Sequence, residues 1–436
     1  MNQNITKPKS GYKLVKNYFK KTFEIPEDWQ YVRYKDVLIE KESPINFNDD
    51  EYYPLITIKR RNEGLMLRST LQGKEIETKN LFSVDVGDFI ISKMQIIHGA
   101  CGSVPKSLSN AKISGSYIRF KSKDILDLKY FNFFSITPLF YQHTFISSVG
   151  SNLEKMNFNK KHWLNHSFPL PPLKQQKKIT SILSNVDSRL NQTKKIIEQT
   201  ERFKKGMIKQ LLTKGIGHKK FKKVKWYFGK EIEIPEKWKL GKLKDYSLKI
   251  GSGVTPEGGS EVYKESGIPL IRSQNVHFDE LYLDNVAYID KKTHDEMKIT
   301  KLQSFDVLLN ITGASIGRCT YVPENFGEGN VNQHVCIIRL KKDIHYGFLT
   351  MFLSTYLMQS RINSIQAGLS RQGLNFKDIG NFLIIIPSIT EQEKIASIYS
   401  KINDRLILIK KYKFNLEALK KGLMQKLLTG EIRVKA

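Results

Sequence analysis

Two long stretches of the chain carry apolar residues at the spacing of an amphipathic helix. After Pro387 the apolar positions are Ile395, Ile398, Ile402, Ile409, Leu416, Leu419, Leu423 and Leu427. After Pro171 they are Ile179, Ile182, Val186, Leu190, Ile197, Phe203, Met207 and Leu211. Lys and Glu fill many of the positions between them, as in a near-heptad coiled coil. The pattern predicts two helices, each about 60 Å long at 1.5 Å per residue.

A helix with one apolar stripe needs a partner that covers the stripe. We expect the two long helices to pack on each other in an antiparallel pair, because each leads away from its own globular body. Packing of each stripe on its own body is the alternative. The segments that precede the helices carry short apolar runs between turn residues, as in ISGSYIRFK from Ile113 and NQHVCIIRLK from Asn332. These runs predict strands, so the expected fold class is α+β.

The chain is an internal repeat. The 46 residues that end at Thr213 align without a gap with the 46 that end at Thr429, and about 18 columns are identical. Both stretches contain the phrase KKG and end on LLT. Upstream, YKLVKNYFKKTFEIPEDW from Tyr12 matches FKKVKWYFGKEIEIPEKW from Phe221 in about 11 of 18 columns. Each copy therefore consists of a basic lead-in, an IPE-x-W motif, a divergent body and a long helix, which predicts a pseudo-two-fold molecule.

The charge of the chain predicts a polyanionic partner. Lys and Arg number 71 against 43 Asp and Glu, a net charge of +28, and charge of this size favours nucleic acid or an anionic membrane surface. No apolar run approaches the roughly 18 residues of a membrane span, and the N-terminus has no apolar signal-peptide core. We therefore expect a cytoplasmic, DNA-binding protein. Cys101, Cys319 and Cys336 are too widely spaced for a disulfide framework or a zinc cluster.

Common catalytic motifs are missing from the sequence. The glycine-rich stretch GSGVTPEGG from Gly251 lacks the lysine of a phosphate loop. We find no G-x-S-x-G or H-E-x-x-H motif, no adenine-methylation motif, no nuclease signature and no metal-binding cluster among the nine histidines. The sequence therefore argues against most common DNA enzymes.

Polar side chains follow the predicted strands of both bodies and are candidates for DNA contact. Arg recognises guanine and Gln or Asn recognises adenine, whereas hydroxyl groups and close backbone approach suit phosphates. The candidates in the first body are Lys59, Arg60, Arg61, Lys93, Gln95, His98, Ser151 and Asn152. Those in the second body are Arg272, Ser273, Gln274, Asn275, Asn310, Thr312, Ser315, Arg318, Asn332, Gln333, His334, Ser370, Arg371 and Gln372. Solvated strand ends and structural turns are the alternative.

At this point the sequence resembles a known family, the specificity subunits of type I restriction-modification systems. The resemblance is carried by the IPE-x-W motifs at Trp29 and Trp238, and by the Q-x-K-I helix openings after Pro171 and Pro387. It is also carried by TPEGGSEVYKESGIPLIRSQNV and FDVLLNITGASIGR in the second copy, and by the repeated K-K-G-x-x-x-x-L-L-T helix end. It covers the chain from about residue 12 to 433.

The resemblance implies two target recognition domains separated by two long antiparallel coiled-coil helices. The expected segments are a lead-in (1–22), recognition domain 1 (23–170), spacer helix 1 (171–215), a basic linker (216–231), recognition domain 2 (232–386), spacer helix 2 (387–430) and a tail (431–436).

The resemblance also implies function and partners. Each recognition domain reads one half of a split, asymmetric site in double-stranded DNA, and the subunit itself has no catalysis. Two modification subunits, which use S-adenosylmethionine to methylate adenine, bind it, and restriction subunits that use ATP and Mg²⁺ can join. None of these cofactors is expected on this chain. The alternatives are the recognition half of a fused restriction-methylation enzyme, which the chain length disfavours, and a coiled-coil scaffold that binds DNA through charge alone.

Overall fold

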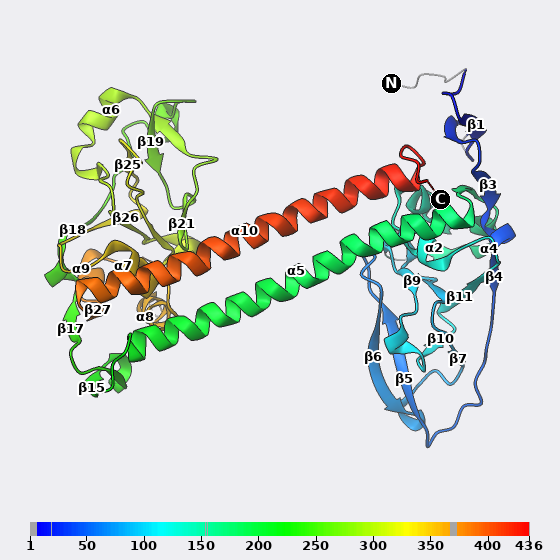
Figure 1. Cartoon of the computed structure of the whole chain (residues 1–436), viewed down its shortest axis with the longest axis horizontal. Helices are drawn as coiled ribbons and strands as arrows, with labels where there is room; N and C mark the ends of the chain where they lie inside the picture. Colours follow the sequence, from blue (N-terminus) through cyan, green and yellow to red (C-terminus); the bar gives the residue numbers. More distant parts are fainter. Residues whose placement is uncertain (1–6, 19, 153, 155, 367–372, 436) are drawn as a thin grey trace. The chain divides into compact units, whose positions relative to one another are not determined.

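The computed structural model describes residues 7–18, 20–152, 154, 156–366 and 373–435. Its two longest helices are α5 (Leu173–Lys214, green in Figure 1) and α10 (Ile389–Leu428, orange to red). The chain divides into two compact units: unit 1 is Met1–Thr193 with Lys413–Ala436, and unit 2 is Lys194–Tyr412. Each unit therefore contains the start of one long helix and the end of the other.

The globular part of unit 1, residues 30–170, is called head 1 below. Its central sheet is antiparallel, in the order β4-β11-β8-β9. The strands are β4 (Leu38–Glu40), β8 (Phe89–Ser92), β9 (Cys101–Ser103) and β11 (Tyr117–Ser122). A second sheet, in the order β6-β5-β10-β7, pairs β10 with β5 in parallel. Its strands are β5 (Tyr52–Ile58), β6 (Leu65–Gln72), β7 (Leu81–Ser83) and β10 (Lys112–Ser114).

Four short helices and three pairs of strands complete the described part of unit 1 around these sheets. The helices are α1 (Tyr34–Val37), α2 (Leu128–Phe134), α3 (Pro138–Ile146) and α4 (Lys160–Leu164). The paired strands are β1 (Tyr12–Lys16) with β2 (Thr22–Pro26), β3 (Gln30–Arg33) with β14 (Ser167–Leu170), and β12 (Ser148–Val149) with β13 (Asn157–Phe158). Local sequence explains the start of α3, because the Thr137 hydroxyl caps it and Pro138 occupies its first turn.

Residues 239–386 of unit 2, called head 2, repeat this topology. The central sheet β18-β26-β23-β24 is again antiparallel, and the smaller sheet β22-β19-β25 again contains one parallel pair, β19 with β25. The strands are β18 (Ser247–Ser252), β19 (Ile268–Ile271), β22 (Ala287–Ile289), β23 (Val307–Asn310), β24 (Cys319–Tyr321), β25 (Asn330–Val331) and β26 (Val335–Leu340). The predicted α+β class and internal repeat are confirmed.

The remaining elements of unit 2 correspond largely to those around head 1. The helices are α6 (Lys291–Glu296), α7 (Tyr346–Leu353), α8 (Tyr356–Gln366) and α9 (Phe376–Gly380). The paired strands are β15 (Phe221–Lys225) with β16 (Glu231–Pro235), β17 (Lys239–Lys242) with β27 (Leu383–Ile386), and β20 (Val276–His277) with β21 (Glu280–Leu281).

The long helices contribute to the hydrophobic core of each unit. In unit 1, Ile179 and Leu183 from the start of α5 join Leu427 and Leu428 from the end of α10 in the core of head 1. In unit 2, the end of α5 and the start of α10 join the core of head 2 in the same way. Because late residues of one helix meet early residues of the other, the helices run antiparallel within each unit.

Most positions of the predicted apolar stripe are buried or half-buried, but two of them are wrong. Phe203 and Leu419, which align in the repeat, are 55% and 51% exposed. The neighbouring residues Lys204 and Lys420 turn inward, since their side chains are only 16% and 25% exposed. A lysine with a polar partner on the other helix, Asp187 for Lys420 and Asn403 for Lys204, therefore occupies the helix contact where a strict heptad places an apolar residue. Along the described part of the chain, none of the helices combines the length and apolar character of a membrane span.

Candidate nucleic-acid interface

A buried glutamine fixes head 1 to the start of its long helix. The Gln176 amide donates hydrogen bonds to the backbone oxygens of Pro171 and Ile125, at 2.7 and 2.8 Å, and accepts one from the backbone of Asp127 at 2.8 Å. In head 2, Gln392 makes the corresponding three bonds to backbone groups. The Q-x-K-I pattern thus marks a joint that holds each head against its helix.

The tryptophan of each IPE-x-W motif makes a second joint. Trp29 donates its indole N–H to Gln175 at 2.9 Å, and Gly430, at the end of α10, lies against the Trp29 ring. In unit 2, Trp238 lies against Gly215, at the end of α5, where an added Cβ would come within 2.7 Å of the ring. Both glycines have positive φ, 77° for Gly430 and 62° for Gly215, as is common just after a helix. Each repeated LLT phrase therefore ends its helix against the tryptophan of the other copy.

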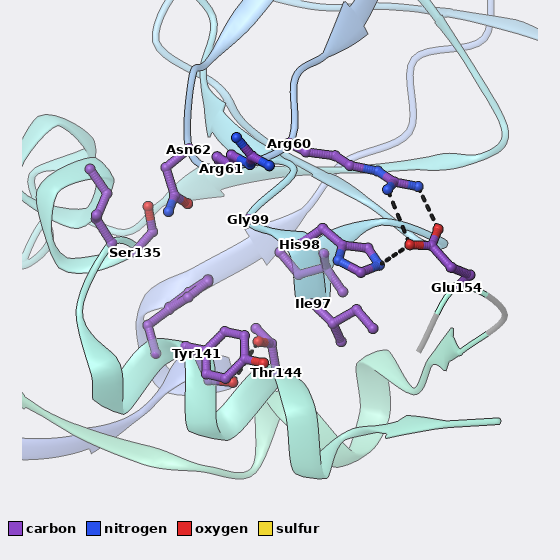
Figure 2. Close-up of a pocket in the computed structure, with 13 residues that line it drawn as sticks. Arg60, Arg61, Asn62, Ile97, His98, Gly99, Ser135, Tyr141, Thr144 and Glu154 are labelled. Carbon is purple, nitrogen blue, oxygen red and sulfur yellow. Dashed lines mark hydrogen bonds and ion pairs between the residues drawn. The ribbon is translucent and has the colours of Figure 1, made fainter. Parts of the chain in front are cut away.

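Two loops of head 1 gather candidate DNA-contact residues around one cavity. Arg61 and Asn62, just after β5, have positive φ values of 59° and 57°. The Arg61 N–H donates to the His98 carbonyl at 2.6 Å, and the Asn62 N–H donates to the Gly99 carbonyl at 3.1 Å. The loops enclose a cavity of about 470 Å³, which α3 also lines (Figure 2). The structure therefore brings Arg60, Arg61 and His98 together, as Figure 2 shows.

An acidic residue that sequence reasoning missed contacts these basic side chains. Glu154 binds the Arg60 guanidinium through both oxygens, at 2.7 and 3.2 Å, and lies 3.7 Å from His98 (Figure 2). The hydrogen bond from Arg60 lowers the pKa of the exposed Glu154 carboxyl. The Asn152 side chain accepts a hydrogen bond from the Glu154 backbone at 2.8 Å. Asn152 and Glu154 thus belong to the rim of the same site, and Ser151 is an exposed residue next to them in the sequence.

The other candidates of head 1 have mainly local contacts. Lys93 donates from Nζ to the Gly115 carbonyl at 2.6 Å, which holds the turn before β11. Gln95 is half-buried, and its Oε1 is a buried atom with no hydrogen-bond partner in the described structure. Lys59 is exposed and lies 3.7 Å from Glu63. Lys93 therefore serves the fold, whereas Lys59 remains accessible.

In head 2, the loop after β19 folds back through Asn275. The Asn275 side chain is 1% exposed, accepts from the Arg272 N–H at 3.0 Å and donates to the Tyr282 carbonyl at 2.9 Å. Its amide group is therefore committed to the fold. Arg272 and Gln274 both reach the Asn285 carbonyl, at 3.3 and 3.4 Å. These two side chains thus lie together on the loop.

Buried Asn310 joins this loop to the next one. Its Nδ2 donates to the Ser273 carbonyl at 2.8 Å and to the Ser315 hydroxyl at 3.1 Å. Arg318 is half-buried and donates its backbone N–H to the Ser315 carbonyl at 3.1 Å. The loops that begin at Arg272 and at Asn310 therefore form one continuous polar surface.

Thr312 and His334 extend this surface into a hydrogen-bonded chain. The Thr312 hydroxyl lies 2.5 Å from His334 Nδ1, and Gln333 Nε2 lies 3.2 Å from His334 Nε2. The Thr255 hydroxyl, in the glycine-rich stretch, donates to Gln333. Sequence reasoning did not include Thr255 among the candidates for DNA contact.

One further candidate of head 2, Asn332, bonds to the backbone of this chain of contacts, and three others fall outside the residues that the structure describes. Asn332 is buried and accepts a hydrogen bond from the His334 backbone at 3.1 Å, so its carbonyl group serves the fold. Ser370, Arg371 and Gln372 lie outside the described residues.

Chemical groups typical of metal or thiol chemistry are not gathered in the described part of the chain. There, no cluster of three or more His, Cys, Asp or Glu is placed to hold a metal ion. Cys101, Cys319 and Cys336 are buried, and burial raises the pKa of each thiol to about 12. What the heads offer a ligand is a set of cationic, amide and hydroxyl side chains on loops, the groups that bind DNA bases and phosphates.

Comparison with known proteins agrees with this description. A family profile described as "Type I restriction modification DNA specificity domain" matches residues 26–202 and 235–418. The type I restriction enzyme MjaVIII specificity subunit of Methanocaldococcus jannaschii is 27% identical over 426 residues, 94% of each chain. The EcoBI specificity subunit of Escherichia coli is 28% identical over 278 residues, 59% of this chain and 57% of its own length.

A solved structure shares the fold. The crystal structure of a type I restriction-modification system S subunit from M. genitalium superposes with a TM-score of 0.59 at 15% identity, over 92% of this chain and 96% of its own. The family profile matches both copies of the repeat, each from near its IPE-x-W motif into its long helix. The chain therefore belongs to the family of type I restriction-modification specificity subunits.

Proposed function

We propose that this chain is the non-catalytic subunit that gives a type I restriction-modification complex its DNA sequence specificity. Head 1 reads one half of a bipartite, asymmetric site in double-stranded DNA, and head 2 reads the other half. The long helices recruit two modification subunits, which use S-adenosylmethionine, and restriction subunits, which use ATP and Mg²⁺, join that complex. The chain itself binds none of these cofactors.

The observation that supports DNA recognition is that the two heads share one sheet topology but carry different side chains on their loops. Both heads have the same central sheet topology and the same glutamine joint to their helix. The loops after β5 and β8 of head 1 carry Arg61 and His98, whereas the equivalent loops of head 2, after β19 and β23, carry Arg272, Gln274 and Thr312. One frame with two sets of polar side chains suits a protein that reads two different sequences with two similar modules.

Exposed apolar residues support the recruitment of two identical partners. Ile196 and Phe203 are exposed on α5, and Tyr412 and Leu419 are exposed at the equivalent repeat positions on α10. The members of each pair are seven residues apart in the sequence, so they lie on one face of their helix. Exposed apolar residues gathered on one face favour a protein partner. Since both helices present exposed apolar residues at the same two repeat positions, each offers a similar surface to one copy of the partner.

The decisive experiment is to express the chain with its modification subunits and map methylated adenines by sequencing. We expect a split motif with a nonspecific gap. Replacement of residues 239–386 by the second head of another family member should change one half of that motif and leave the other half unchanged. A change in both halves, or methylation without sequence preference, would contradict the proposal. Methyl transfer from labelled S-adenosylmethionine by the chain alone would instead support a fused enzyme, and equal affinity for specific and random duplexes would support a charge-only scaffold.

A further inference from the structure

The first lysine of the repeated KKG phrase is neutralised differently in the two units. In unit 1, Lys420 on α10 forms an ion pair with Asp187 on α5, with 2.7 Å between Nζ and Oδ1. In unit 2, the equivalent Lys204 on α5 faces Asn403 on α10, and its Nζ donates to Oδ1 at 2.8 Å. Asn403 aligns with Asp187 in the gapless repeat. The helix pair of unit 2 thus has a neutral amide where unit 1 has a carboxylate.

The carboxylate that faces Lys204 belongs to head 2. Asp279 lies at the turn between β20 and β21, and its Oδ2 is 3.0 Å from Lys204 Nζ. The same oxygen accepts a hydrogen bond from the Tyr399 hydroxyl on α10 at 2.5 Å. The Lys204 ammonium also lies 4.4 Å from the centre of the Tyr399 ring. One oxygen of head 2 therefore contacts both long helices.

The burial and the backbone conformation of Asp279 indicate that its contacts with the long helices are a specific part of the fold. The Asp279 side chain is 11% exposed, and solvent therefore weakens its ion pair less than that of a surface pair. Its φ is +65°, a left-handed conformation that is unfavourable for residues other than Gly and, to a smaller degree, Asn or Asp. Glycine would relieve the backbone but would remove the carboxylate, so the bonds to Lys204 and Tyr399 offset the strain of keeping aspartate.

The turn that Asp279 anchors adjoins the candidate DNA loop of head 2. The β20–β21 hairpin begins directly after Asn275, and the Tyr282 N–H closes its base by donating to the Asn275 carbonyl at 2.8 Å. Its tip is held to α5 and α10 by Asp279, and its base carries Arg272 and Gln274. A shift of the tip should therefore move the polar side chains at the base.

We propose that Asp279 is a positioning residue for DNA recognition by head 2: by joining the β20–β21 hairpin to α5 and α10, it fixes the loop that contains Arg272 and Gln274. In unit 1 the carboxylate for the equivalent lysine comes from α5, so that ion pair joins the two long helices, and Lys420 approaches head 1 only as a cation 5.9 Å from the centre of the Phe133 ring. This inference rests on the proposed function, because it assigns Asp279 to one of the two recognition heads.

The test uses the full chain with its modification subunits and duplexes that carry the motif methylated by the wild-type complex, or that motif with one half replaced. Asp279→Asn keeps the size of the side chain and tolerates the left-handed backbone. We expect discrimination against replacement of one half to fall about ten-fold, comparable to one lost base-pair preference, with discrimination at the other half unchanged. Equal loss at both halves, or no loss, would overturn the proposal.

Two further variants separate positioning from stability. Asp279→Asn removes the ion pair of Lys204 and should lower the melting temperature. Adding Asn403→Asp returns a carboxylate to Lys204 from α10 but leaves the hairpin unanchored, so the melting temperature should recover while discrimination does not. Recovery of both would show that only neutralisation of Lys204 matters and would overturn the proposal. Asp187→Asn is the matched control in unit 1 and should lower the melting temperature without changing discrimination at either half. If the wild-type complex methylates no split motif, the proposed function fails. If it does methylate one but Asp279→Asn discriminates as well as the wild type, only the role of Asp279 fails.

Discussion

Trp238 donates its indole N–H to the Glu391 carboxylate at 2.9 Å, so the tryptophan that precedes head 2 is bonded to the first turn of α10. The same carboxylate accepts from the Ile216 N–H at 2.9 Å and lies 3.0 Å from His218. Glu391 therefore connects three parts of unit 2: the linker after α5, Trp238 just before head 2, and the first turn of α10. In the first copy the neutral Gln175 accepts from Trp29 in its place.

Glu391→Ala should destabilise the protein by about 2 kcal/mol, because it leaves the indole N–H of buried Trp238 without an acceptor. Glu391→Gln imitates the first copy and retains an acceptor for Trp238, so we expect about half of that loss. The measurement is the free energy of unfolding in denaturant. Glu393→Ala, at an exposed position two residues along α10, is the control and should change it by less than about 0.5 kcal/mol. Equal effects of the Gln and Ala variants would contradict this account of the joint.

A buried ion pair should be the most sensitive polar contact of head 2. Asp306, which is 1% exposed, binds Arg339 of β26 through both oxygens, at 2.8 and 2.7 Å. Removal of one member of a buried pair typically costs about 3 to 5 kcal/mol, and the Arg339 side chain left behind is 22% exposed and can be partly hydrated. Asp306→Ala should therefore lower the unfolding free energy of unit 2 by about 3 kcal/mol, at the lower end of that range. The exposed Asp343→Ala should be nearly neutral, and similar losses for the two variants would refute the assignment.

The long helices and the two-copy organisation could be predicted from the sequence, because helix periodicity and repeated phrases are visible in it. The apolar stripe identified α5 and α10, and the repeated phrases identified two equivalent copies. It misassigned Phe203 and Leu419 because heptad spacing does not reveal that a neighbouring lysine will pair inside the helix contact. It also gave Asn275 and Asn332 as candidate readers, although their side chains bond to the surrounding backbone. Partners such as Glu154 and Asp279 depend on how distant loops fold together, which residue type alone does not determine.

Acid should destabilise unit 1 through two buried histidines. Burial lowers the pKa of His143 to about 3 and that of His166 to about 4, and the rings stack at 4.8 Å. Below pH 6.5 the unfolded chain binds protons at these residues that the folded chain does not, so stability falls as the pH decreases. We expect a loss of about 3 kcal/mol between pH 7 and pH 5. His143→Gln should reduce the slope of unfolding free energy against pH, and an unchanged slope would exclude this histidine as a source.

The exposed apolar faces of the long helices should be required for assembly. Phe203→Glu and Leu419→Glu should each weaken binding of one modification subunit, and the double variant should lose both, as measured by the mass of the co-purified complex. Leu408→Gln is the control, because Leu408 is also exposed but its equivalent in the first copy is Gln192. Two bound modification subunits in the double glutamate variant would exclude these positions as docking sites.

The contact between Arg60 and Glu154 should limit how strongly head 1 attracts DNA. Both side chains are about half exposed, so a phosphate could replace the carboxylate on the guanidinium. Glu154→Gln frees Arg60 and removes a negative charge from the rim of the cavity, and it should tighten binding to random duplexes and steepen the salt dependence by about one unit. Arg61→Ala should have the opposite effect, with a slope shallower by about one unit. Glu77→Gln removes the same charge from an exposed position that is not among the cavity-lining residues, and should change the affinity less than Glu154→Gln. Anisotropy titrations over a salt series measure all three, and weaker binding by Glu154→Gln would show that the carboxylate supports the DNA surface instead of competing with it.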